Sequence, residues 1–445
     1  MNKEFHKKQN FFSFSDIDSE RKDRIMKFTS TEATPAPHVP PGVLRLTGAA
    51  KEDIPMYRIQ TMNKISPVGL NRFPSELYEV GDAVQDPQGI LVRSAKLLDM
   101  EFNPGLLAIA RAGVGVNNIP LDRCAEAGIP VVFNTPGANA NAVKELVICA
   151  MLMGSRDIPG AIRWVREQAA SGVDVSTVVE KGKSAFIGPE LYKKTLGIIG
   201  LGAIGSIVAN TAISLGMDVY GYDPFLSVDT ALRLDRHVHV VKDINDLYKR
   251  SDYITMHIHY TEKTAHMIDA DAIAAMKRGV RVINLARGEI VDDEAMLTAL
   301  DTGMVAAYIT DFPNNRLLTA PHVIAMPHLG ASTPESEQNC AAMAVDTLRD
   351  YLESGNIRSS VNLPEMTMDR SGVQRLCVLH KNVPGMLANI TSLFGRDGVN
   401  VENLSNKSRG DYAYTMVDLG SKVGDNVIED VRRTANVIRV RSLEW

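Results

Sequence analysis

The stretch TLGIIGLGAIGSIVANTAISLGMDVYGYD, residues 195–223, decides the fold of this chain. The apolar run from Leu196 to Ile199 is typical of a short strand buried in a parallel sheet. Gly200, Gly202 and Gly205 follow with the spacing G-x-G-x-x-G and lead into a helical pattern. A second strand then ends at Asp223. The order predicts a strand, a tight glycine turn, a helix and a second strand.

This unit predicts a dinucleotide site. The first glycine allows the turn, the second lets a pyrophosphate approach the backbone, and the third lets the helix pack closely on the strand. The unpaired N–H groups at the start of the helix attract phosphate oxygens. The Asp223 carboxylate can accept hydrogen bonds from an adenosine ribose, and it would repel a 2′-phosphate. We therefore predict NAD as the cofactor, with Gly200, Gly202, Gly205 and Asp223 binding it.

Length and composition narrow the class of protein. A chain of 445 residues predicts about three domains, and 45% hydrophobic with 23% charged residues is ordinary for a globular protein. The net charge of −5 argues against nucleic acid or an anionic membrane as a partner. The four cysteines are scattered without metal-ligand spacing, and no apolar run reaches membrane-spanning length. We expect a cytoplasmic protein with reduced thiols and no metal.

The chain divides by pattern into an α/β protein of several parts. Residues 1–55 are charged and then proline-rich, which predicts a poorly ordered extension; Met56 marks the expected functional start. Alternating strand and helix patterns predict two doubly wound, Rossmann-like domains. The first, for substrate, is discontinuous over residues 56–155 and 328–360, and the second, for NAD, covers 156–327. A linker, 361–372, precedes a β-α-β-β-α-β pattern of ferredoxin-like type over 373–445.

Three polar residues follow apolar strands, where open α/β sheets bind ligands. Arg287 can clamp a carboxylate or polarise a carbonyl, or serve as a surface ion-pair arginine. His328 is suited to taking a hydroxyl proton while hydride leaves the same carbon, and we favour that role over a structural one. Asp311 either orients His328 or shapes a turn before Phe312 and Pro313. These residues predict a hydroxyacid dehydrogenase site.

Several motifs carry a family resemblance: VRSA (92–95), ARAGVGVNNI (110–119), NTPGANANAVKE (134–145), INLARGEIVDDEA (283–295) and PHLGAST (327–333). With them the chain, over residues 57–445, resembles the D-isomer-specific 2-hydroxyacid dehydrogenases. NTPGANA and the C-terminal module resemble the branch that oxidises 3-phospho-D-glycerate to 3-phosphohydroxypyruvate in L-serine biosynthesis. Another 2-hydroxy acid, such as glycerate or 2-hydroxyglutarate, and a non-enzymatic NAD-sensing role remain alternatives.

The resemblance assigns further site residues. It places the catalytic arginine at Arg287 and the catalytic histidine at His328, but the family's glutamate has no counterpart in TDFPNN, where ungapped matching leaves Asn315. Either Asp311 takes that role from a neighbouring position, or His328 works without a strong carboxylate partner. The resemblance adds to the cofactor site Ala203, Ile204, His257, Ala286 and Arg287, and to the substrate site Arg93, Ser94, Val114 and Gly115.

The roles of two further groups of residues stay open at this point. Lys181 and Lys183 either supply cations for a substrate phosphate, from a neighbouring subunit, or are ordinary solvated lysines. The C-terminal module resembles an ACT domain, and His380, Asn382 and Asn400 match a serine-binding site. Asn382 and Asn400 are alternatively turn residues. An exposed edge strand of that module favours a homodimer or homotetramer.

Overall fold

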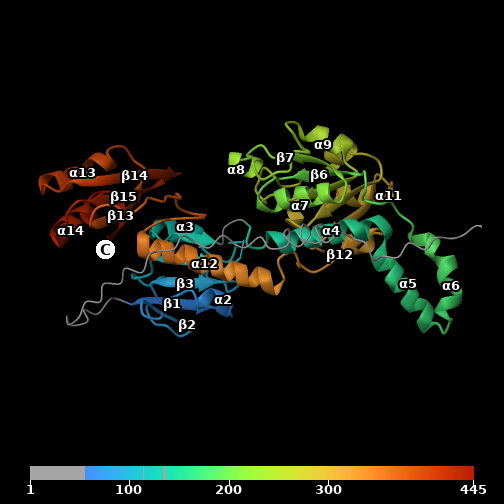
Figure 1. Ribbon diagram of the computed structural model, residues 1–445, viewed down its shortest axis with the longest axis horizontal. Coiled ribbons are helices and arrows are strands. Elements are labelled where there is room, and N and C mark those ends of the chain that lie inside the picture. The colour runs from blue at the N-terminus through green and yellow to red at the C-terminus, as the bar shows by residue number, and fades with distance from the viewer. Residues whose placement is uncertain (1–55, 114, 134–136) are drawn as a thin grey trace, which may run out of the picture. The chain divides into compact units, whose positions relative to one another are not determined.

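The structure is a computed structural model that describes residues 56–445, apart from residue 114 and residues 134–136. The extension predicted for residues 1–55 lies outside the described residues. The described part contains two parallel sheets and one antiparallel sheet, each with its own helices (Figure 1). The α/β class with parallel, doubly wound sheets is therefore confirmed.

The first sheet has five parallel strands in the order β2-β1-β3-β4-β5. Alternate side chains of its strands enter two different cores, one beneath helix α12 and one beneath helix α3. In β4, for example, Ala108 and Ala110 belong to the first core and Ile109 belongs to the second. The elements are β1 (Tyr57–Met62), α2 (Pro67–Leu70), β2 (Tyr78–Gly81), β3 (Gly89–Val92), β4 (Ala108–Arg111), α3 (Leu121–Glu126), β5 (Val131–Phe133) and α12 (Pro334–Ser354).

The second sheet has seven parallel strands in the order β12-β11-β10-β9-β6-β7-β8. The chain reverses its direction of winding at β6, which pairs with both β7 and β9. Such a switch point opens a crevice at the carboxyl ends of the strands, where ligands bind. The strands are β6 (Thr195–Ile199), β7 (Asp218–Tyr222), β8 (Val238–Val241), β9 (Tyr253–Met256), β10 (Val280–Asn284), β11 (Val305–Thr310) and β12 (Val323–Ala325).

Helices cover both faces of this second sheet. Helices α4 and α7 share one core with Leu196 and Ile198, while α9, α10 and α11 share the other core with Ile254 and Val282. The helical elements are α4 (Ala140–Arg156), α7 (Ala203–Ser214), α8 (Val228–Ala231), α9 (Ile244–Arg250), α10 (Ala270–Ala274), η2 (Gly288–Ile290), α11 (Asp293–Asp301) and η3 (Leu317–Thr319).

The apolar spacing over residues 139–168 predicts one long helix, and the structure breaks this segment into two. Asp157 adopts a left-handed conformation, with φ 34° and ψ 51°, and its side chain accepts a hydrogen bond from the Gly160 N–H. The chain restarts there because Asp157 caps a new helix that has Pro159 in its first turn. The new segment is a helical arm of α5 (Ile158–Ala170), α6 (Val175–Gly182) and η1 (Lys183–Phe186), seen in green in Figure 1.

The C-terminal sheet is antiparallel, with the order β14-β15-β13-β16. Its elements follow in the predicted β-α-β-β-α-β order: β13 (Gln374–Lys381), α13 (Met386–Arg396), β14 (Val401–Arg409), β15 (Tyr412–Leu419), α14 (Asp425–Arg433) and β16 (Val437–Glu444). The domain boundaries stay predictions, although α4, assigned from the sequence to the first domain, packs with α7. No helix in the described part is long and apolar enough to cross a membrane.

Candidate functional site

The glycine turn has a geometry that distinguishes its three glycines. Gly200 has φ +89°, and a Cβ there would lie 2.6 Å from the His257 carbonyl oxygen. A Cβ on Gly205 would lie 1.9 Å from the Gly200 carbonyl oxygen, so only glycine lets α7 pack on the turn. A Cβ on Gly202 would face open space, with no atom of the described residues within 4 Å. The open side of the turn is thus the side that Gly202 and the first turn of α7, Ala203 and Ile204, present.

Asp223 lies beside this turn, immediately after β7. One carboxylate oxygen accepts the Leu201 N–H at 2.9 Å, and the other accepts the Phe225 N–H at 2.9 Å. A carboxylate has about four acceptor positions, so both oxygens can still accept ribose hydroxyls. His257 follows β9, and its backbone N–H donates to Ile199 at 2.7 Å. Burial lowers the pKa of His257 to about 4, so its ring is neutral at physiological pH.

A buried amide fixes the loop that carries Arg287. The Asn284 side chain is fully buried at the end of β10; its amide group donates to the Arg287 carbonyl at 2.8 Å, and its oxygen accepts the Ala286 N–H at 3.1 Å. Arg287 also donates from Nη1 to the Ala286 carbonyl at 2.6 Å. The sequence interpretation assigned no role to Asn284, although it lies within the motif INLARGEIVDDEA that contains Arg287.

Phe312 connects the two predicted catalytic residues. Its ring lies 4.6 Å from the His328 ring, centroid to centroid, and the Arg287 guanidinium carbon lies 5.9 Å from its centroid. Phe312 follows β11 and packs against Gly288, whose Cβ would lie 3.4 Å away from it. Arg287 and His328 are therefore held on one aromatic side chain at the carboxyl ends of neighbouring strands. The sequence interpretation used Phe312 only as a turn neighbour.

Asp311 is buried behind this group and is only 1% exposed. Its Oδ2 accepts the Gly330 N–H at 3.3 Å, while its Oδ1 is buried without a hydrogen-bond partner among the described residues. Burial raises the pKa of Asp311, and the positive charge of a protonated His328 opposes that shift. Asn315, the ungapped counterpart of the family's glutamate, is exposed. Asp311 is therefore the carboxylate that acts electrostatically on His328.

The first sheet contributes an arginine cluster. Arg93, just after β3, pairs with Glu337 of α12 at 2.7 Å, and both side chains are about half exposed. Two polar side chains hold the loop that begins there: Asn63 accepts the Ser94 N–H at 3.0 Å, and Asn118 donates to the Ala95 carbonyl at 2.7 Å. The Ser94 N–H is therefore already used within the protein.

Arg111, the last residue of β4, joins the same cluster and was missed in the sequence. A Cβ on Gly115 would lie 3.9 Å from Nη2 of Arg111 and 3.6 Å from Nη2 of Arg287. Guanidinium groups from both parallel sheets thus approach one glycine. Gly115 is among the predicted substrate residues, whereas its predicted neighbour Val114 lies outside the described residues.

The other predicted residues lie elsewhere. Lys181 and Lys183 are exposed on the helical arm, where Lys183 pairs with Glu180. His380 is buried, and its ring nitrogens contact the Lys381 carbonyl at 2.8 Å and the Thr415 hydroxyl at 2.9 Å. The predicted ligand residues Asn382 and Asn400 are exposed, and their amides donate to Gly410 and Glu402, respectively.

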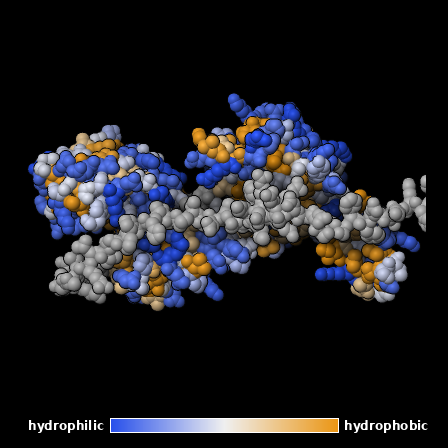
Figure 2. Space-filling model, viewed as in Figure 1, coloured by the Kyte–Doolittle hydropathy of each residue, from blue (hydrophilic) through white to orange (hydrophobic). Residues whose placement is uncertain are grey.

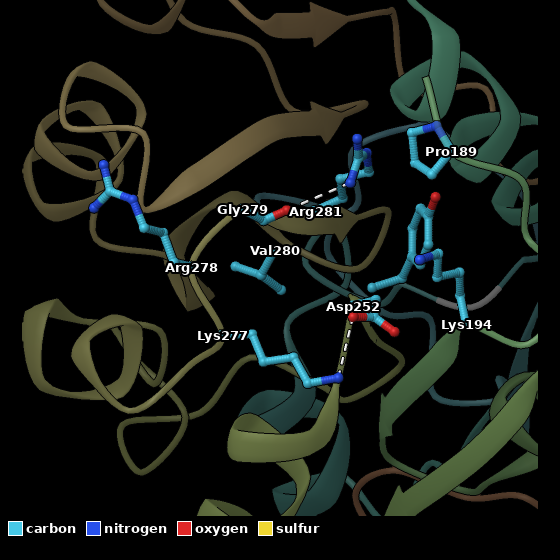
Figure 3. A pocket seen from close by; sticks show the side chains of 9 residues that line it. Pro189, Lys194, Asp252, Lys277, Arg278, Gly279, Val280 and Arg281 are labelled. Carbon is cyan, nitrogen blue, oxygen red and sulfur yellow. Dashed lines mark hydrogen bonds and ion pairs between the residues drawn. The ribbon is translucent and has the colours of Figure 1, made fainter. Parts of the chain in front are cut away.

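A small pocket of about 60 Å³ lies at the opposite end of the second sheet (Figure 3). Its lining includes Tyr253 and Val280, which begin β9 and β10, so it opens at the amino ends of the strands. Several of its charged groups already have partners, since Lys277 pairs with Asp252 at 3.1 Å and Arg281 donates to the Gly154 carbonyl at 2.8 Å. This pocket is separate from the glycine turn.

Comparisons with known proteins agree with this geometry. Residues 148–330 match the family model of the D-isomer specific 2-hydroxyacid dehydrogenase NAD-binding domain. The chain is 33% identical over 351 residues to D-3-phosphoglycerate dehydrogenase of Escherichia coli K12, covering 76% of this chain and 82% of that one. It is 37% identical over 327 residues to the Synechocystis enzyme of the same name, covering 72% of this chain. The chain spans only 56% of that relative's length.

Solved structures are also similar to this chain. NAD⁺-bound 3-phosphoglycerate dehydrogenase of Entamoeba histolytica matches with a TM-score of 0.54 and 27% identity, over 69% of this chain and 99% of that one. D-mandelate dehydrogenase of Rhodotorula graminis, at 21% identity and a TM-score of 0.60, shares the fold. The chain belongs to the D-isomer-specific 2-hydroxyacid dehydrogenase family. Its second domain is an NAD-binding domain, so the predicted cofactor class is confirmed.

Proposed function

We propose that this protein oxidises 3-phospho-D-glycerate at carbon 2, with NAD, to 3-phosphohydroxypyruvate, the first step of phosphorylated L-serine biosynthesis. The observation that carries the proposal is the contact of Arg287 and His328 with one aromatic ring, Phe312, at the carboxyl ends of strands of the second sheet. The names of the E. coli and Synechocystis relatives support this choice of substrate.

Each residue has a defined role in the reaction. NAD, held by the residues of the glycine turn and by Asp223, would supply the acceptor for the hydride of carbon 2. His328 takes the proton of the carbon-2 hydroxyl, so that a carbonyl forms there. Arg287 binds the neighbouring carboxylate and stabilises charge on the developing carbonyl oxygen. Asp311 stabilises the imidazolium, because its buried carboxylate has little other solvation.

The residues around the glycine turn fit the cofactor. Gly202 leaves open space where a pyrophosphate needs to approach the backbone, and Asp223 retains acceptor capacity for a ribose. Gly200, Gly205, Ala203 and Ile204 shape the turn and the start of α7. His257 and Ala286 complete the proposed NAD contacts.

The test is NADH formation with 3-phosphoglycerate, D-glycerate and 2-hydroxyglutarate as substrates. We expect turnover with 3-phosphoglycerate and a loss of about 10²- to 10⁴-fold in kcat for His328→Asn. His322→Asn, at an exposed histidine before β12, is the matched control and should retain activity. Turnover confined to another acid would reassign the substrate. NAD binding without turnover on any acid would favour the NAD-sensing alternative.

The C-terminal module is proposed to be an ACT domain that binds L-serine. Its β-α-β-β-α-β order supports this assignment. So do the positions of the three matched residues: His380 lies on β13, Asn382 follows β13, and Asn400 precedes β14. The bonds of His380 to Lys381 and Thr415 have to yield if its ring is to contact serine. Serine titrated calorimetrically into wild-type protein and Asn382→Ala tests the site; equal binding to both contradicts it.

The proposed assembly is a homodimer or homotetramer in the cytoplasm. Neither α5 nor α6 has a buried side chain, and Figure 2 shows apolar side chains gathered on their arm. Ile162 is 51% exposed there. Light scattering should show a smaller particle for Ile162→Glu, but not for Val68→Glu, a control residue that is 50% exposed on α2. A monomeric wild-type protein would contradict the assembly.

A further inference from the structure

Three polar side chains are buried together behind Arg287 and Phe312, toward the carboxyl ends of β10 and β11. They are Asn284, Tyr308 and Thr310, and each is at most 1% exposed. Asn284 and Thr310 are direct partners in the parallel pairing of the two strands, and Tyr308 points to the same face as Thr310 because side chains alternate along a strand. Polar groups buried in this way cost stability unless they are hydrogen-bonded.

Hydrogen bonds join these side chains into one continuous chain. The Asn284 amide donates to the Arg287 carbonyl at 2.8 Å and to the Tyr308 hydroxyl at 3.3 Å. The side chain of Thr310 is the second hydrogen-bond partner of Tyr308. The Thr310 hydroxyl oxygen in turn accepts the Phe312 N–H at 3.0 Å. A buried path of polar groups therefore connects the backbone of Arg287 with the backbone of Phe312.

The Phe312 end of this path reaches His328. The bond between the Phe312 N–H and the Thr310 side chain closes a tight turn around Asp311. From that turn the Phe312 ring contacts the His328 ring, with 4.6 Å between the centroids. The His328 ring has no hydrogen bond within the part of the chain that the structure describes. The route from the buried path to His328 therefore runs through the Phe312 ring.

The Tyr308 hydroxyl is suited to fixing structure and not to proton transfer. Burial raises the pKa of Tyr308 to about 12, and the bonds to Asn284 and Thr310 oppose that shift, so the hydroxyl stays neutral at physiological pH. A phenylalanine would fill nearly the same core volume. What the hydroxyl adds is direction, because buried polar groups with satisfied hydrogen bonds favour one arrangement of the segments that carry them.

We propose that Asn284, Tyr308 and Thr310 form a positioning network that sets Arg287 and His328 relative to each other, with Tyr308 joining the two loops. The inference rests on the proposed function and deepens it, because it adds positioning residues to the same site. The group that clamps the carboxylate and the group that takes the proton have to act on neighbouring carbons of one substrate. A small displacement of one against the other should therefore slow the reaction more than it weakens binding.

The first test compares Tyr308→Phe with the matched control Tyr253→Phe. Tyr253 begins β9 of the same sheet, is fully buried, and its hydroxyl bonds to that of Ser155 at 2.7 Å. We expect Tyr308→Phe to lower kcat for 3-phosphoglycerate by about 10- to 100-fold and to change KM by less than about threefold. Tyr253→Phe should leave both constants unchanged, although the two variants lose a similar amount of thermal midpoint. Equal effects of the two variants on kcat overturn the inference.

The second test uses Thr310, where volume and hydroxyl can be separated. Thr310→Val keeps the volume and should lower kcat, whereas Thr310→Ser keeps the hydroxyl that accepts the Phe312 N–H and should retain most of kcat. A merely structural role would give the reverse order, because serine leaves a cavity. The double variant of Tyr308→Phe and Thr310→Val should lose no more activity than the weaker of its single variants. Higher activity of Thr310→Val than of Thr310→Ser contradicts the network.

NMR of ¹³C-labelled histidine needs no turnover and separates this inference from the proposed function. The His328 ring signal, identified by its loss in His328→Asn, should move in Tyr308→Phe, because the ring current of Phe312 acts on it. Tyr253→Phe should leave that signal in place. Movement in Tyr308→Phe alone supports the network even if the wild type turns over none of the acids. An unmoved His328 signal in Tyr308→Phe overturns it.

Discussion

Arg375 is fully buried, whereas Arg111 is only partly buried, and the surroundings of the two arginines differ. Arg375, on β13, is fully buried; Nε and Nη2 donate to Asp418 at 2.6 and 2.8 Å, and the remaining donors reach the carbonyls of Ser354, Met368 and Asp369. Arg111 has a buried Nε without a partner among the described residues, and other arginines as its charged neighbours. The donors of Arg375 are used within the fold, whereas Arg111 keeps one buried donor without a partner among the described residues.

The largest effect is expected on the free energy of unfolding, when the buried pair of Arg375 and Asp418 is broken. Asp418→Asn leaves the Arg375 charge buried without its carboxylate, which should lower the free energy of unfolding by about 3–5 kcal/mol in urea titrations. The control is Glu444→Gln, which breaks an exposed ion pair with Lys422 and should cost less than about 1 kcal/mol. Equal costs for the two variants would show that burial of the pair makes no difference.

Asp311 extends the comparison to a carboxylate, because its Oδ1 is also buried without a partner. Asp311→Asn should lower kcat by about 10²-fold, since the imidazolium of His328 loses its counter-charge, and leave unfolding in urea nearly unchanged. Burial raises the pKa of Asp311, so activity should fall with acid above the usual carboxyl range, and this limb should disappear in the variant. An unchanged pH–kcat profile would exclude the pairing.

A smaller effect is expected from filling the space between the guanidinium groups of Arg111 and Arg287. Gly115→Ala places a methyl group in ordinary contact with Arg287 and within 4 Å of Arg111, without a clash. The variant should fold normally and lose about tenfold in kcat/KM, because the methyl group occupies substrate space. Gly395→Ala, on α13 with open space around it, is the control and should keep full activity. Full activity of Gly115→Ala would move the substrate elsewhere.

The smallest effect concerns His257, a partly buried ring whose pKa is lowered. Its pKa is lowered from 6.5 to about 4, so the unfolded chain binds a proton between these values and the folded protein does not. Stability should therefore decline as the pH falls from 6.5 to about 4, and His257→Asn should show a shallower decline in thermal midpoint. His237→Asn, at an exposed histidine, is the matched control, and a slope shared by all three proteins would contradict this assignment.

The sequence predicted the features that depend on neighbours in the chain. Gly200, Gly202 and Gly205 have separate local roles, so their spacing was sufficient to predict the turn, and Asp223 follows the next strand. The break at Asp157 was missed even though Pro159 signals it, because the helical pattern continues on both sides. Local patterns thus predicted the NAD turn and the element order, but they predicted one helix where the chain has two.

The parts that the sequence left open depend on distant contacts. Arg111 ends a strand and looks like any arginine beside a glycine loop; only the folded chain brings Arg287 close to it, with no carboxylate among the described residues paired with it. The same holds for Phe312, whose contact with both Arg287 and His328 requires three separate loops. Charge balance in a buried cluster is a property of the folded chain.

The most direct test is the thermal midpoint of Arg111→Met and Arg375→Met, with and without saturating 3-phosphoglycerate. Our account predicts that Arg111→Met keeps or raises the ligand-free midpoint and loses most of the rise that the ligand gives wild type. Arg375→Met should lower the ligand-free midpoint, because Asp418 loses its partner, and retain the rise. A lowered ligand-free midpoint for Arg111→Met together with an intact ligand-induced rise would contradict the account.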